Sequence, residues 1–152
     1  MKDEFAGIEP RVYESSINVP YSWWAGDTAS RFFTAIRDDK KILGSKCGKC
    51  GTVYLPPRKS CISCFVDTDE WVELSSEGEV IAVTVARRQL AALKSKVPVV
   101  FALIKLGGAD TAILHIIKTD NPDSVEIGMK VRARFAEERT GGIMDIECFE
   151  PV

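Results

Sequence analysis

The chain has 152 residues, enough for one domain of ordinary size or a small module joined to a second one, and its 45% hydrophobic and 28% charged residues exclude wholesale disorder. A formal net charge of −2 makes the whole chain a poor bulk binder of nucleic acid. The N-terminus lacks the apolar core of a signal peptide and the longest apolar run, residues 97–104, is too short to span a membrane, so a cytoplasmic protein is expected.

Residues 1–26 show no clear period, and prolines and glycines interrupt them, so an extended arm is expected there. Tyr21, Trp23 and Trp24 gather within four positions of this arm. Aromatic side chains of this size need burial against this chain or another one. Two interpretations stay open, docking onto a partner protein or packing on the chain's own helix.

A helix is expected after the arm, with Asp27 or Thr28 as its cap and with an end before residue 44. At helical spacing, one apolar face is formed by Phe32, Phe33 and Ile36.

Two Cys-x-x-Cys pairs follow, Cys47 with Cys50 and Cys61 with Cys64, in a segment rich in turns and short of apolar residues. Two such turns facing each other surround one ion with four sulfurs, which leaves no open position for catalysis. The segment is too small to bury a core, so a structural zinc ion is expected to hold it. Iron is the alternative because a rubredoxin-like site has identical ligands. A redox dithiol would not explain two pairs this close together.

The rest of the chain has the pattern of strands. Alternation and β-branched runs predict five strands, near residues 79–87, 97–106, 111–118, 130–136 and 143–149. Residues 107–110 are expected to form a hairpin turn. Five strands with one longer connection suit a small closed barrel of the OB type, and a β-sandwich is the alternative.

The expected fold is therefore mainly β with an N-terminal helix. An arm and helix occupy residues 1–42, a zinc ribbon residues 43–70 and a five-stranded OB-fold barrel residues 71–152. Trp71 is predicted to pack between the ribbon and the barrel, and His115 and Cys148 are predicted to be core residues. No catalytic set follows from the spacing of the side chains, and the chain has a single histidine.

Several of these features occur in a fixed order. The sequence Cys47-Gly-Lys-Cys50-Gly51 precedes Tyr54-Leu-Pro-Pro-Arg58, the second cysteine pair, Trp71 and Gly78-Glu-Val-Ile-Ala-Val-Thr84. In this order they resemble the acyl-CoA-associated OB-fold proteins with an N-terminal rubredoxin-like zinc ribbon, a family long described only as a domain of unknown function. The resemblance runs from about Tyr21 to the C-terminus.

This resemblance implies a non-catalytic accessory or scaffold subunit rather than an enzyme. Proteins of this kind are partners of thiolase-like enzymes, including steroid side-chain aldolases and archaeal complexes that join acetoacetyl-CoA thiolase to hydroxymethylglutaryl-CoA synthase. It therefore implies a thiolase-like or hydroxymethylglutaryl-CoA synthase-like partner and a CoA thioester as ligand, with no organic cofactor, in lipid or isoprenoid metabolism.

Two basic pairs are candidate CoA-binding residues, because phosphates suit Arg forks: Arg58 with Lys59, and Arg87 with Arg88. We expect both pairs to line one groove between ribbon and barrel. The alternative is that they are solvated surface charges or ion pairs with a partner. The segment from Val19 to Trp23 is similar to the arm of the archaeal-type members, so the candidate partner contacts are Tyr21, Trp23 and Trp24.

A nucleic-acid-binding module is the alternative function, because zinc ribbons and OB barrels both bind DNA or RNA. Such OB surfaces carry stacking aromatics, whereas the expected strands offer chiefly Phe101, Phe135 and Phe149. The barrel half is also acidic, so nucleic acid is not the expected partner. A third hypothesis is an independent hydratase-like or redox enzyme.

Overall fold

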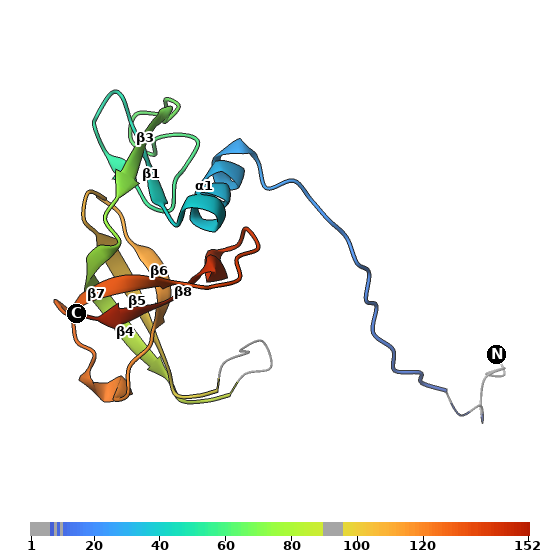
Figure 1. Ribbon diagram of the computed structural model, residues 1–152. Coiled ribbons are helices and arrows are strands. Elements are labelled where there is room, and N and C mark those ends of the chain that lie inside the picture. The colour runs from blue at the N-terminus through green and yellow to red at the C-terminus, as the bar shows by residue number, and fades with distance from the viewer. Residues whose placement is uncertain (1–6, 8, 10, 90–95) are drawn as a thin grey trace.

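The computed structural model describes residues 7, 9, 11–89 and 96–152, in which the strands form two sheets. The smaller sheet has the order β2-β1-β3, and the other five strands close a barrel in the order β4-β5-β6-β8-β7 (Figure 1). The strands are β1 (Ile42–Lys46), β2 (Val53–Tyr54), β3 (Glu70–Leu74), β4 (Glu77–Ala86), β5 (Val99–Leu106), β6 (Ile113–Ile117), β7 (Lys130–Phe135) and β8 (Ile146–Pro151).

One α-helix, α1 (Asp27–Asp39), lies beside the small sheet, and the arm before it runs away from the body of the protein (Figure 1). Phe32 and Ile36 are buried as predicted, at 2% and 0% exposure. The predicted cap was wrong, because Gly26 occupies the cap position with φ 84° and no side chain caps the helix. No helix in the described part of the chain is long and apolar enough to cross a membrane.

The small sheet contains two strands that the sequence did not reveal, β1 and β3. They pair antiparallel along their whole length, from Ile42 opposite Leu74 to Lys46 opposite Glu70. Gly44 lies in the middle of β1, where a Cβ atom would come within 2.9 Å of Val53 Cγ1. A glycine normally weakens a strand, but here it lets β2 approach closely.

The five predicted barrel strands are confirmed, with one change at the last of them. Residues Ile143–Asp145 form a short 3-10 turn, η2, and β8 starts only at Ile146. The buried carboxylate of Asp145 holds this turn by accepting the N–H groups of Thr140, Gly141 and Gly142. β8 then pairs with β7 and, in parallel, with β6, which closes the barrel.

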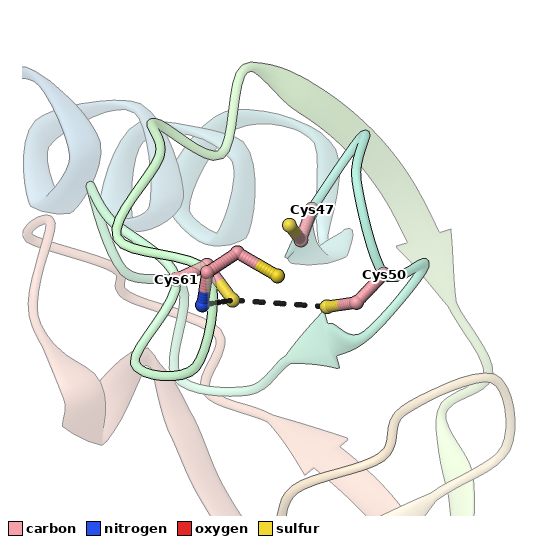
Figure 2. Close-up of side chains that lie close together, drawn as sticks. Cys47, Cys50 and Cys61 are labelled. Carbon is pink, nitrogen blue, oxygen red and sulfur yellow. Dashed lines mark hydrogen bonds between the residues drawn. The ribbon is translucent and has the colours of Figure 1, made fainter.

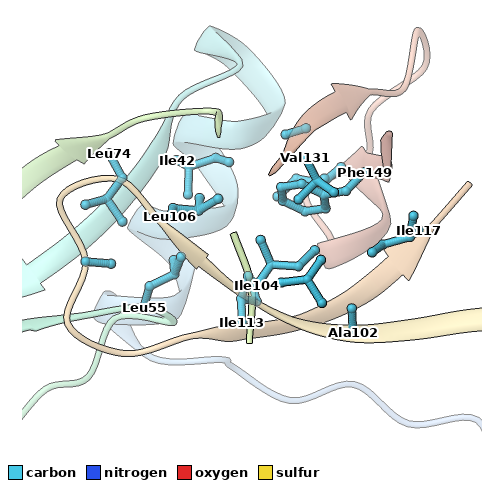
Figure 3. Packing of buried hydrophobic residues seen from close by; sticks show 14 of the residues in the cluster. Ile42, Leu55, Leu74, Ala102, Ile104, Leu106, Ile113, Ile117, Val131 and Phe149 are labelled. Carbon is cyan, nitrogen blue, oxygen red and sulfur yellow. The ribbon is translucent and has the colours of Figure 1, made fainter. Parts of the chain in front are cut away.

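One continuous hydrophobic core joins the two sheets. Leu55, which directly follows β2, and Leu74 of β3 lie beside Leu106 of the barrel (Figure 3), and all three are at most 6% exposed. Trp71 was predicted at this junction, and that prediction was wrong. It lies half-buried on β3 under the guanidinium of Arg31, whose central carbon is 4.6 Å from the ring centroid. The smaller aliphatic side chains fill the junction instead.

His115 and Cys148 are core residues, as predicted, with 4% and 3% exposure. The imidazole packs edge-on against Phe149 and its Nε2 atom lies 3.4 Å from the carbonyl oxygen of Ile143. The buried Nδ1 atom has no hydrogen-bond partner among the residues that the structure describes. Burial lowers the pKa of His115, so the ring is neutral near pH 7.

The turn between β5 and β6 forms a clasp, a set of four hydrogen bonds to β2 and the residue after it. The Asp110 carboxylate accepts the N–H of Val53 at 2.8 Å, and the Asp110 N–H donates to the Val53 carbonyl at 2.9 Å. The Thr111 hydroxyl accepts the N–H of Leu55 at 2.7 Å and donates to the carbonyl of Leu55 at 2.9 Å. Residues 107–110 form the predicted hairpin turn, and Asp110 together with the next residue, Thr111, attaches the ribbon to the barrel.

Candidate metal centre and binding surfaces

Two equivalent turns present the cysteines, a first knuckle (residues 47–51) and a second knuckle (residues 61–65). The Gly51 N–H donates to the carbonyl of Cys47 at 2.8 Å, and the Phe65 N–H donates to the carbonyl of Cys61 at 3.0 Å. Gly51 and Phe65 both have positive φ, 78° and 55°. The two knuckles therefore have the same backbone course with a different fifth residue.

The knuckles bring the four predicted cysteines together, with all four sulfur atoms within 4.8 Å of one another. The sulfurs of Cys47, Cys50 and Cys61 point toward one another (Figure 2), and those of Cys50 and Cys61 are 3.7 Å apart. A zinc ion at about 2.3 Å from each sulfur requires a sulfur–sulfur separation of about 3.8 Å. The site therefore fits a tetrahedral zinc ion whose four protein ligands leave no open position.

Tyr54 supports the centre from within the ribbon. Its buried hydroxyl lies 3.2 Å from the sulfur of Cys61, and the hydrogen bond that it donates lowers the pKa of this thiol to about 6. Burial and the neighbouring sulfurs raise the pKa of Cys64 to about 12. A divalent cation between the sulfurs opposes that rise, because ligation favours the thiolate.

Arg58 is fixed at the edge of the centre through its backbone. The hydroxyl of Ser45, a fully buried residue, accepts the Arg58 N–H at 2.9 Å and donates to the Arg58 carbonyl at 3.0 Å. Thr68 donates to the same carbonyl oxygen. The exposed guanidinium reaches over the Tyr54 ring, with its central carbon 6.0 Å from the centroid. The sequence suggested Arg58 but gave no sign that Ser45 positions it.

The two predicted basic pairs do not share one groove. Arg58 and Lys59 belong to the ribbon, whereas Arg87 and Arg88 follow β4, whose ten residues span about 30 Å away from the ribbon. Arg87 forms an ion pair with Asp123 in the 3-10 turn η1 (Pro122–Ser124). The prediction of a common groove was wrong because β4 separates the pairs by its full length.

Lys59 faces a different hollow, of about 280 Å³, between α1 and the ribbon. Arg31 and Trp71 also line this hollow, together with three aspartates, Asp27, Asp67 and Asp69. With more carboxylates than cations, the hollow does not suit a phosphate group.

The arm aromatics are exposed, Tyr21 at 79% and Trp23 and Trp24 at 75% each. The rings of Tyr21 and Trp23 contact each other, with centroids 5.4 Å apart. The hypothesis that these side chains pack on the chain's own helix was therefore wrong. Docking onto another protein stays a prediction.

The outer face of β4, β5 and β6 is free of charge over two rows of opposed residues. The rows are Ala82, Leu103 and Leu114, and Thr84, Phe101 and Ile116. Leu103 and Leu114 are 38% and 60% exposed. OB-folds bind oligonucleotides on this face with cations and stacking rings. Its largely aliphatic surface therefore disfavours nucleic acid.

Comparison with known proteins matches two family models, which meet between residues 70 and 71, at the start of β3. The family model of the ChsH2 rubredoxin-like zinc ribbon domain matches residues 34–70. The model of the ChsH2 C-terminal OB-fold domain matches residues 71–136.

Two archaeal relatives are each called a DUF35 domain-containing scaffold protein. The one from Methanocaldococcus jannaschii is 31% identical over 113 residues, which cover 74% of this chain and 79% of the relative. The one from Methanothermobacter thermautotrophicus is 31% identical over 102 residues, 66% of this chain and 76% of the relative.

Two solved structures share the fold. A protein of unknown function from the DUF35 family of Sulfolobus solfataricus has a TM-score of 0.62 at 26% identity, over 83% of this chain and 84% of its own. A chain of an aldolase named Ltp2-ChsH2(DUF35) has a TM-score of 0.63 at 23% identity, over 85% of this chain and 98% of its own.

Proposed function

Because the chain belongs to the family of DUF35 domain-containing scaffold proteins, we propose that it is a non-catalytic subunit that binds a thiolase-like enzyme and helps to hold the CoA thioester of that enzyme. The relatives are named as scaffolds, and one similar structure is that of an aldolase that includes a DUF35 chain. The need for reduced thiols at the metal centre agrees with a cytoplasmic location.

The observation that carries the proposal is the exposure of the arm aromatics. Tyr21, Trp23 and Trp24 are each at least 75% exposed, although large aromatic side chains usually find a partner. Tryptophan and tyrosine are also the residues that most often dominate the energetics of protein interfaces. An arm of this kind gains its contacts on another protein.

The test is co-expression with the thiolase-like enzyme, or the hydroxymethylglutaryl-CoA synthase-like enzyme, encoded beside this chain. The proposal predicts that the two proteins co-purify in a fixed ratio and that Trp23→Ala with Trp24→Ala weakens the complex at least about tenfold. Tyr13→Ala is the matched control, since Tyr13 is an aromatic residue of the same arm with 80% exposure. A chain that purifies alone beside each of these enzymes contradicts the scaffold role.

Binding of the CoA thioester is proposed for Arg58, whereas Lys59 faces the aspartate-lined hollow, which does not suit a phosphate group. Arg58 has a fixed backbone and an exposed guanidinium, which suits a fork to phosphate oxygens. In the complex, Arg58→Ala is expected to weaken CoA binding measured by calorimetry. Arg88→Ala serves as the control because Arg88 lies at the far end of β4.

The non-catalytic role is tested with the isolated protein. Titration of the metal-loaded chain with CoA thioesters is expected to give no turnover, and metal analysis is expected to give one zinc ion per chain. Turnover by the chain alone favours the hypothesis of an independent enzyme.

A further inference from the structure

The second knuckle ends in a small apolar tip on the surface of the ribbon. The tip consists of Ile62, Phe65 and Val66, with 59%, 86% and 38% exposure. It lies directly beside the metal centre, because Cys61 and Cys64 belong to the same turn. Phe65 thus projects from the turn that contains two of the four clustered cysteines.

The backbone at Phe65 has a conformation that its side chain disfavours. A φ of 55° lies in the left-handed region, where a bulky residue is a genuine outlier. The equivalent residue of the first knuckle is Gly51, which adopts a φ of 78° without a Cβ clash. The same turn is therefore built once with the favoured residue and once with phenylalanine.

The exposed side chain of Phe65 gains little burial within the described chain that would offset the backbone strain. A ring that shielded the sulfurs from water would be buried, whereas Phe65 is among the most exposed large hydrophobic residues of the described chain. Strained residues that the fold does not need tend to occur at functional sites. The tip is therefore a candidate contact with another molecule.

The charges near the tip indicate which charges the contacting surface of that molecule carries. From Cys47 to Val66 the chain has three basic residues, Lys49, Arg58 and Lys59, and no acidic residue, although Lys59 shares its hollow with Asp67 and Asp69, which follow this segment. All three are exposed, and none forms an ion pair with a carboxylate of the described chain. An apolar pocket with carboxylates at its rim would complement this surface.

We propose that Phe65 anchors the ribbon in an apolar, acid-rimmed pocket of the partner enzyme. This inference rests on the proposed function and adds the ribbon contact to that of the arm. The metal holds the second knuckle, and the knuckle holds Phe65 in an orientation that costs no rearrangement on binding.

Substitution of Phe65 by residues that suit its backbone separates stability from binding. Phe65→Gly and Phe65→Asn both accept a positive φ. Each variant is expected to keep its metal and to melt at or above the temperature of the wild type. Each is expected to bind the co-expressed thiolase-like enzyme at least about tenfold more weakly.

The control is Ile127→Ser, which removes another large hydrophobic side chain, 68% exposed, from the loop before β7. It is expected to leave binding unchanged. If the wild type binds the enzyme and either Phe65 variant binds as tightly, the anchor is refuted and the scaffold role stands. If the wild type does not bind, both fail.

The same tip chemistry also fits an anionic membrane surface. Wild type and Phe65→Gly are therefore sedimented with vesicles of phosphatidylserine and phosphatidylcholine. Loss of vesicle binding in Phe65→Gly with unchanged binding of the enzyme overturns the proposal in favour of a lipid contact.

Discussion

The barrel and the ribbon are held together by different means. The barrel closes on itself around side chains with no exposure at all, among them Val80, Ile104 and Phe149. In the described chain, the ribbon has a small cluster of its own around the sulfurs, formed by Cys47, Tyr54 and Cys61, and its other buried hydrophobic side chains belong to the core that it shares with the barrel. We therefore expect the barrel to stay folded when the ribbon is disrupted, whereas the ribbon should need both its metal and its packing against the barrel.

The largest effect is expected when the metal end is broken. Cys61→Ser removes a buried ligand, and structural zinc sites contribute about 10–16 kcal/mol of binding free energy to folding. We expect loss of the metal, an unfolded ribbon and loss of partner binding, with most of the β-sheet circular dichroism retained. A wholly unfolded chain, or an unchanged ribbon, would contradict the separation of the two regions.

The control for this substitution is Cys148→Ala, which alters a buried cysteine of the barrel. Because this sulfur is not part of the metal cluster, the variant is expected to retain one metal ion per chain.

Breaking the barrel core should act on both regions. Phe149→Ala removes a fully buried ring, which typically costs about 3–5 kcal/mol. The ribbon shares this core through Leu55 and Leu74, so it should lose its packing when the barrel melts. A single melting transition by circular dichroism and metal release is the expected result. Two well-separated transitions would show that the ribbon does not depend on the barrel.

The clasp between the regions should have a smaller effect. Asp110→Ala leaves the N–H of Val53 without its acceptor, which costs about 1–3 kcal/mol if the group stays buried. The loss should appear as faster hydrogen exchange in β2 with unchanged exchange in β8. Asp123→Ala is the control, because its exposed ion pair with Arg87 is worth at most about 1 kcal/mol.

The smallest effect concerns the acid stability of the barrel. Burial lowers the pKa of His115 below its usual value of 6.5, so at mildly acidic pH the imidazole is protonated more readily in the unfolded chain than in the folded barrel. The contribution of the neutral His115 to the free energy of unfolding is fully present above pH 6.5 and decreases as the pH drops below this value. His115→Leu should reduce the loss of melting temperature between pH 7 and pH 5. Both proteins carry the Cys61→Ser substitution in this comparison, so that metal release does not contribute. If His115→Leu loses as much melting temperature between pH 7 and pH 5 as the protein with His115, the prediction is contradicted.

The sequence revealed the parts of the protein that have a local pattern. Cys-x-x-Cys spacing located the metal centre, and runs of alternating or β-branched residues located the five barrel strands. β1 was not predicted because Gly44 interrupts its strand pattern. The glycine is needed for the close approach of β2, which is a tertiary contact that the sequence does not show.

The contacts that the sequence could not reveal join distant segments. Asp110 appeared to be an ordinary turn residue and Thr111 the first residue of a strand, and the hydrogen bonds of both to the segment of β2 depend on how the ribbon packs on the barrel. The separation of Arg58 from Arg87 depends on the direction in which β4 runs. Phe65 differed from Gly51 in a way visible in the sequence, but only the φ angle gives that difference meaning.

The central claim is that the metal braces the ribbon while the barrel stands by itself. Hydrogen exchange of the full chain, with and without a strong chelator, tests it most directly. We predict that metal removal exposes the amides between Cys47 and Val66 and leaves the amides of β5 and β8 protected. Equal loss of protection in both regions, or continued protection of the ribbon without its metal, would contradict this account.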